Sequence, residues 1–121
     1  GYNRAINRKK YHIRQIETEL ADETCLRHAI YHELSRLIVL RRNNKAFHPD
    51  SDFKINSVTP AVMQIKRTAE TGEEITGLFN ISAQTQTINI DIENGFDLIS
   101  EESISGKELT LHAWQVMWIK K

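Results

Sequence analysis

The sequence predicts an α+β chain in which two helices precede an all-β antiparallel sandwich. Apolar residues recur at helical spacing in the first part of the chain, and after Pro49 they alternate with polar residues instead. The 121 residues are 40% hydrophobic and 26% charged, which is the composition of an ordinary globular domain. Composition therefore excludes a disordered chain and a collagen-like repeat.

The helical part contains a short helix followed by a long one. Residues 13–20 carry an apolar face at helical spacing, formed by Ile13, Ile16 and Leu20. A longer helix is expected from Asp22 to Asn43, because Asp22 or Thr24 can accept hydrogen bonds from the free N–H groups of its first turn. One side of this helix holds Leu26, Ile30, Leu34, Leu37, Ile38 and Arg41. We expect this broad apolar side to support the β-domain, whose own core is thin at this size.

Seven short strands are expected in the second part of the chain, at residues 53–56, 61–68, 74–82, 85–92, 96–99, 108–112 and 114–119. Turns are expected at residues 70–73, 82–84, 94–95 and 105–106, where glycine or small polar residues favour a reversal of the backbone. Short strands at this spacing are typical of a β-sandwich.

Charge and cysteine content narrow the classes of protein. Residues 1–47 contain 10 Lys and Arg against 5 Asp and Glu, and residues 48–121 contain 6 against 11. The basic residues are spread over several elements instead of forming a stripe, so we expect no nucleic-acid partner. No apolar stretch is long enough to span a bilayer, so we expect no membrane partner. The single cysteine, Cys25, and the absence of a signal peptide favour a cytoplasmic protein.

Few side chains suggest a metal or catalytic site. His28 and His32 have the spacing of a zinc pair, but Ala29 follows the first histidine where zinc proteases have glutamate, so we expect no metal. We also expect no cofactor, because the sequence has no glycine-rich phosphate loop. Three pairs of neighbouring acids are interpreted as solvated charges: Glu17 with Glu19, Glu73 with Glu74, and Glu101 with Glu102. We therefore expect no catalytic residue in this chain.

Two further features allow a binding role. Trp114 and Trp118 could stack on a sugar ring, although their spacing favours a shared core face on one strand. The segment from Asn3 to Tyr11 is polar and irregular, and its arginines suit recognition of hydroxyls or carboxylates. A plain solvated loop is the alternative interpretation of this segment.

Four motifs in order resemble sucrose phosphorylases and their relatives in glycoside hydrolase family 13. Residues 3–8 with Tyr11 are similar to a G-R-x-I-N-R segment, and residues 37–49 are similar to the last barrel helix and its A-F-H-P exit. Residues 78–82 and 109–118 resemble two strands of the β-domain that follows the barrel in this family. Together these motifs cover nearly the whole chain.

The resemblance implies that residues 1–47 end a (β/α)8 barrel, with its last loop and helices, and that residues 48–121 form the C-terminal antiparallel β-domain. Arg4 would bind the glucosyl unit of the substrate, and Asn7 and Arg8 would support the loop. The aspartate nucleophile and glutamate acid/base of this retaining family would lie in a missing N-terminal barrel.

The resemblance also implies partners and leaves other interpretations open. In the intact enzyme the partners would be a glucoside substrate and phosphate. Asn3 replaces the family's glycine, and Ala113 and Trp114 replace a proline and a tyrosine, so the acceptor sugar is not specified. One alternative is a free-standing β-sandwich that binds carbohydrate or protein. Another is a helix pair that binds nucleic acid through its basic residues.

Overall fold

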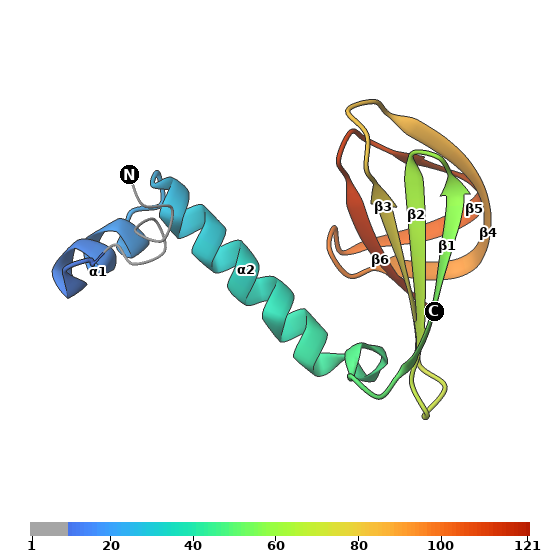
Figure 1. Ribbon diagram of the computed structural model, residues 1–121, viewed down its shortest axis with the longest axis horizontal. Coiled ribbons are helices and arrows are strands. Elements are labelled where there is room, and N and C mark those ends of the chain that lie inside the picture. The colour runs from blue at the N-terminus through green and yellow to red at the C-terminus, as the bar shows by residue number, and fades with distance from the viewer. Residues whose placement is uncertain (1–9) are drawn as a thin grey trace, which may run out of the picture. The chain divides into compact units, whose positions relative to one another are not determined.

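The computed structural model describes residues 10–121. It contains helices α1 (Ile13–Ala21) and α2 (Leu26–Asn43), a 3-10 helix η2 (Lys45–Phe47) and six strands (Figure 1). The predicted order of two helices followed by an antiparallel β-domain is confirmed. The chain divides into two compact units, one that ends at Ile38 and one that comprises Val39–Lys121. The predicted boundary between a barrel at 1–47 and a β-domain at 48–121 concerns a longer protein and stays a prediction.

The long helix begins later than the sequence pattern predicted. Asp22 Oδ1 accepts hydrogen bonds from the backbone N–H of Thr24 at 2.9 Å and from its hydroxyl at 2.7 Å. An aspartate that bonds two residues ahead forms a turn of its own, so the chain turns before the helix starts at Leu26. Within residues 10–121, no helix is long and apolar enough to cross a membrane.

The apolar side of α2 is open in this chain. Leu26 is 73% exposed, and Ile30, Leu34 and Ile38 are each about half exposed. Neither α1 nor α2 has a buried residue. Near the end of α2, Leu40 packs against a buried cluster of the β-domain, and support of the β-domain by the rest of this apolar side stays a prediction.

Six strands form one antiparallel sheet in the order β1-β2-β3-β6-β4-β5. They are β1 (Asp52–Thr59), β2 (Val62–Thr68), β3 (Glu74–Asn80), β4 (Gln86–Asp97), β5 (Glu102–Leu111) and β6 (Val116–Lys120). The predicted turns at residues 70–73 and 82–84 connect β2 to β3 and β3 to β4.

The predicted turns at residues 94–95 and 105–106 are wrong, and so is the count of seven strands. Gly95 lies inside β4 and Gly106 inside β5, and the pairing of these two strands shifts register around them. A Cβ atom on Gly95 would lie 2.7 Å from Ile119 Cγ2, so glycine permits a close approach there. A glycine in the sequence can mark a β-bulge inside a strand as readily as a turn between two strands. This ambiguity explains why turns were predicted at these two glycines.

The main core joins strands from both ends of the sheet. Its buried residues come from five strands and are Val62, Leu78, Ile88, Ile92, Leu111, Met117 and Ile119. Val62 on β2 and Leu111 on β5 share this core although their strands stand far apart in the strand order. The sheet therefore folds over on itself, and its two halves pack face to face as in a sandwich.

We expect the two parts of the chain to differ in hydrogen exchange. Amides of β3 should exchange slowly because Ile75, Gly77 and Leu78 are buried, whereas those of α1 should exchange quickly because that helix buries no residue. Exchange followed by mass spectrometry on this chain would measure the difference. Equally slow exchange in both elements would contradict the predicted difference between the helices and the β-domain.

Candidate functional site

The residues predicted to bind or support a substrate lie outside the described part of the chain. Arg4, Asn7 and Arg8 precede residue 10, so their predicted roles stay predictions. Tyr11, which closes the same polar segment, is described and exposed. Of this segment, the structure describes Lys10 and Tyr11.

Tyr11 is held by an arginine of the long helix. The Arg27 guanidinium lies 4.8 Å from the centre of the Tyr11 ring, and its Nη2 lies 3.5 Å from the phenol oxygen. Arg27 also forms an ion pair with Glu19 of α1. A cation over an aromatic ring contributes about 0.5–1 kcal/mol at an exposed site. One arginine of α2 thus contacts both Tyr11 and a carboxylate of α1.

A second polar network fixes the end of α2 to the sheet. Lys120 Nζ on β6 donates to Glu73 Oε2 at 2.7 Å and to Asn44 Oδ1 at 2.8 Å. Glu73 Oε1 accepts the backbone N–H of Ala46 at 2.9 Å, and the amide of Asn44 donates to the carbonyl of Leu40 at 2.8 Å. We call this network, centred on Glu73 and Lys120, the junction. It joins the end of α2, η2, the β2–β3 turn and β6.

Further contacts on η2 reinforce the junction. Arg67 Nε donates to the carbonyl of Ala46 at 2.7 Å, and one of its Nη atoms donates to that of His48 at 2.8 Å. Ala46 is fully buried in a second apolar cluster with Ile75 and Leu98. Leu40, Phe47 and Trp118 pack against this cluster, and the rings of Phe47 and Trp118 lie 4.8 Å apart.

The junction corrects the interpretation of one acidic pair. Glu73 and Glu74 were predicted to be solvated charges, yet Glu73 pairs with Lys120, and Glu74 pairs with Lys66 at 2.6 Å. Hydrogen bonds from Lys120 and from the Ala46 backbone hold the pKa of Glu73 below its ordinary value. A carboxylate held ionised in this way stabilises the fold and is poorly suited to deliver a proton.

The histidines of α2 make a structural contact. His28 Nδ1 lies 2.7 Å from the carbonyl oxygen of Leu20, so this nitrogen donates a hydrogen bond to the end of α1. The rings of His28 and His32 lie 4.1 Å apart. Among residues 10–121 no group of three or more His, Cys, Asp or Glu side chains is arranged to hold a metal ion.

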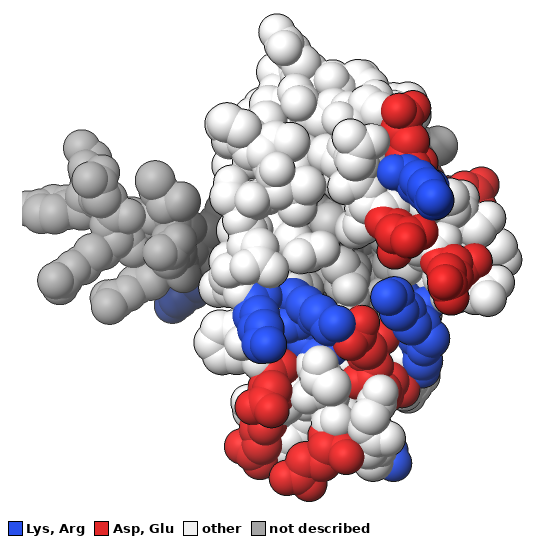
Figure 2. All heavy atoms as spheres, turned by 90° about the vertical axis from the view of Figure 1, so that its right-hand side faces the viewer, with Lys and Arg blue, Asp and Glu red and all other residues white. Residues whose placement is uncertain are grey.

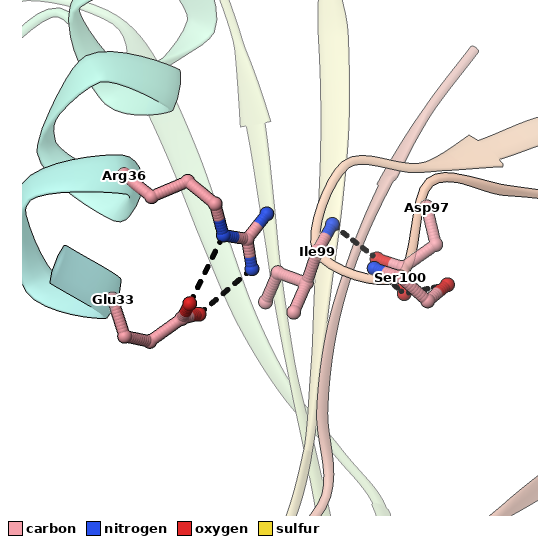
Figure 3. Close-up of polar contacts among 5 residues, drawn as sticks. All are labelled: Glu33, Arg36, Asp97, Ile99 and Ser100. Atoms are coloured by element: carbon pink, nitrogen blue, oxygen red, sulfur yellow. Dashed lines mark hydrogen bonds and ion pairs between the residues drawn. The ribbon is translucent and has the colours of Figure 1, made fainter. Parts of the chain in front are cut away.

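Asp97 is a buried carboxylate that the sequence pattern does not single out, and it is 1% exposed. Figure 3 shows its side chain beside Ile99 and Ser100. Its carboxylate accepts the backbone N–H groups of Ile99, Ser100 and Trp118, the last at 2.7 Å, and the hydroxyl of Ser100 at 2.8 Å. These bonds fix the turn after β4 to β6. The serine three residues after the aspartate was an available signal, because such pairs often form a turn.

Figure 3 also shows an ion pair within α2. The Arg36 guanidinium donates to both carboxylate oxygens of Glu33, at 2.7 and 3.0 Å. These bonds hold the pKa of Glu33 below its ordinary value. The pair occupies one of the helix arginines that could otherwise have contributed to a basic surface.

The two tryptophans do not share a strand face, contrary to prediction. Trp118 lies on β6 and packs against the second cluster, as expected of a core residue. Trp114 lies in the β5–β6 turn, is 64% exposed and has a backbone φ of 61°. The alternating pattern misled because β5 ends at Leu111 and β6 begins only at Val116.

One comparison by sequence relates this chain to a known protein. No protein-family model matches the sequence. The chain is 58% identical to glucosylglycerate phosphorylase of Escherichia coli over 120 residues, which are 99% of this chain and 22% of that protein. The chain therefore spans about a fifth of the length of this relative.

Two solved structures share the fold at low sequence identity. An Anoxybacillus α-amylase superimposes with a TM-score of 0.63 at 18% identity, over 74% of this chain and 21% of its own. Trehalulose synthase of Pseudomonas mesoacidophila gives a TM-score of 0.66 at 18% identity, over 86% of this chain and 19% of its own. These likenesses confirm the fold, in which helices precede an antiparallel β-domain.

We expect Glu73→Gln to destabilise this chain at neutral pH. Glutamine keeps an oxygen for the Ala46 N–H but removes the charge opposite Lys120, so the free energy of unfolding should fall by about 1 kcal/mol. Since folding lowers the pKa of Glu73, its contribution is complete above the ordinary value of 4.5 and is lost as pH falls through the lower folded value. Urea unfolding at neutral pH and at about pH 3 would measure both effects.

The matched control is Glu70→Gln, because Glu70 is exposed in the same turn. This variant should unfold within about 0.5 kcal/mol of the parent at both pH values. Equal losses in the two variants, or a Glu73→Gln loss that persists undiminished in acid, would contradict the role of the junction.

Proposed function

We propose that this chain is the C-terminal part of a phosphorylase-like protein of glycoside hydrolase family 13, in which it supports a (β/α)8 barrel and supplies a substrate-binding loop. The intact protein, a cytoplasmic enzyme of carbohydrate metabolism, transfers the glucosyl unit of a glucoside to phosphate. The single observation that carries this proposal is the 58% identity to glucosylglycerate phosphorylase across the chain. Glucosylglycerate is accordingly the first glucoside to test.

The proposed reaction is a retaining double displacement. An aspartate attacks the anomeric carbon while a glutamic acid protonates the leaving oxygen, which forms a covalent glucosyl enzyme. The glutamate then takes a proton from the second substrate, phosphate, whose oxygen displaces the aspartate and yields glucose 1-phosphate. Both carboxyl groups come from the remainder of the barrel, so this chain alone is inactive.

Arg4 is the residue of this chain proposed to bind substrate. A guanidinium presents several N–H donors in a fixed plane, which suits the hydroxyls of a glucosyl unit beside a carboxylate. Asn7 and Arg8 support the loop without touching the substrate. The contact between Tyr11 and Arg27 supports this arrangement, because it anchors the residues that follow the loop.

The described residues favour this proposal over the alternatives. A free-standing sandwich has no use for a helix such as α2, whose apolar side is open to solvent from Leu26 to Ile38. A nucleic-acid surface needs available cations, yet Arg27 and Arg36 pair with carboxylates and Arg67 donates to backbone carbonyls. Both features fit a chain that rests against the rest of a larger enzyme.

The chain alone should release neither glucose nor glucose 1-phosphate from glucosylglycerate or sucrose. It lacks the proposed nucleophile and acid/base, which together account for nearly all of the rate. The assay is product release with and without phosphate, and the intact protein serves as the positive control. Turnover that survives repurification and disappears when an acidic residue of this chain is replaced would contradict the proposal.

In the intact protein, Arg4→Lys should lower kcat/KM for the glucosyl donor by about 100-fold, because lysine keeps the charge but loses the planar fork. Arg8→Lys is the matched control and should reduce thermal stability more than turnover. Steady-state kinetics and thermal unfolding of both variants distinguish the two roles. A change within about twofold for Arg4→Lys would mean that less than roughly 0.4 kcal/mol was lost, and the binding role would be wrong.

A further inference from the structure

One end of the β-domain carries no charged side chain. Three segments meet there, residues 59–61, 81–87 and 112–115, and none of them contains Asp, Glu, Lys or Arg. Figure 1 places them at the end of the sheet opposite the β2–β3 turn, and the top of the surface in Figure 2 is free of charge. We call these three segments the uncharged end.

A buried amide holds the uncharged end together. Asn80, 3% exposed, donates through Nδ2 to the carbonyls of Gln84 at 2.7 Å and His112 at 2.8 Å. Its Oδ1 accepts the N–H of Ser82 at 3.0 Å and the hydroxyl of Ser82 at 2.8 Å. The backbone N–H of Ile81 donates to the carbonyl of Ala61 at 2.9 Å. The three segments therefore form one connected surface.

Trp114 is the large aromatic side chain that this surface presents to solvent. It is 64% exposed, although indole is among the side chains that gain most from burial. Its backbone lies in the left-handed region, which a bulky residue rarely adopts, and its N–H donates to the carbonyl of Ser82 at 3.1 Å. The turn thus holds an indole outward at a conformational cost.

The surroundings of Trp114 are polar but neutral. Gln84, Thr85, Thr87 and His112 are exposed in the same three segments. Amides, hydroxyls and an imidazole can each donate and accept hydrogen bonds, as the hydroxyls of a sugar can. An acidic peptide or a phosphate would find no complementary cation here. The surface therefore combines an aromatic face with neutral hydrogen-bonding groups.

We propose that the uncharged end is a binding site for a neutral sugar, on which a pyranose ring stacks against Trp114. The site belongs to the β-domain and shares no residue with the substrate-binding loop proposed at residues 3–8. It would hold a neutral glucose-containing chain near the enzyme without taking part in glucosyl transfer. The inference does not depend on which glucoside the intact enzyme cleaves.

The experiment is native electrophoresis of the intact protein in gels with and without soluble starch, a neutral glucose polymer. The parent should be retarded by starch, and Trp114→Ala should lose the retardation, with a dissociation constant at least about tenfold weaker. Trp114→Phe keeps an aromatic face and should retain part of the retardation. The value of kcat/KM for the glucosyl donor should stay within about twofold of the parent in both variants.

Two control variants locate the binding. Phe53→Ala removes a similarly exposed aromatic side chain, 60% exposed, from β1 beside Lys54, and should be retarded like the parent. Arg4→Lys, which alters the proposed catalytic site, should also remain retarded. Loss of retardation in Arg4→Lys but not in Trp114→Ala would place the polymer in the catalytic site and overturn the inference.

The remaining outcomes also decide the proposal. A parent that starch does not retard overturns it, and a lower melting temperature for Trp114→Ala would then identify Trp114 as a contact with the rest of the protein. Failure of glucosyl transfer with retardation intact would refute the proposed function and leave the sugar site supported. Glucosyl transfer by a protein that starch does not retard would support the proposed function and overturn the sugar site.

Discussion

The ion pair between Glu73 and Lys120 is the contact that attaches residues 40–47 to the sheet of the β-domain. The two residues are 47 positions apart, and the same carboxylate and ammonium also bind the Ala46 backbone and the Asn44 side chain. Both partners are half-buried, so removing either one would leave the other poorly solvated. The end of α2, η2, a hairpin turn and the last strand therefore meet at one pair of charges, which Arg67 and the second apolar cluster reinforce.

The two parts of the chain are stabilised in different ways. The β-domain buries a core that spans five strands, and Asp97 adds a buried carboxylate satisfied by three backbone N–H groups. Helices α1 and α2 instead keep their apolar sides exposed and are joined by surface contacts such as Glu19 with Arg27. Exposed ion pairs of this kind contribute little, so the helices need a further apolar surface to be stable.

Periodicity predicted most of the fold but not its long-range contacts. The change from helical to alternating spacing located both helices and most of the strands, because those patterns are local. Gly95 and Gly106 were assigned to turns because a glycine in a strand and a glycine in a turn look alike in sequence. The partner of Glu73 could not be predicted from local spacing, and the exposure of Trp114 depends on a turn conformation that alternation hides.

Ion pairs determine what several carboxylates of this chain can do. Glu19, Glu33, Glu73 and Glu74 are each engaged by a lysine or an arginine. For Glu33 and Glu73 these contacts lower the pKa, whereas an acid catalyst near neutral pH needs a pKa raised by burial or by a like charge. The carboxylates engaged in this way are held ionised and therefore act in stability instead of in proton transfer.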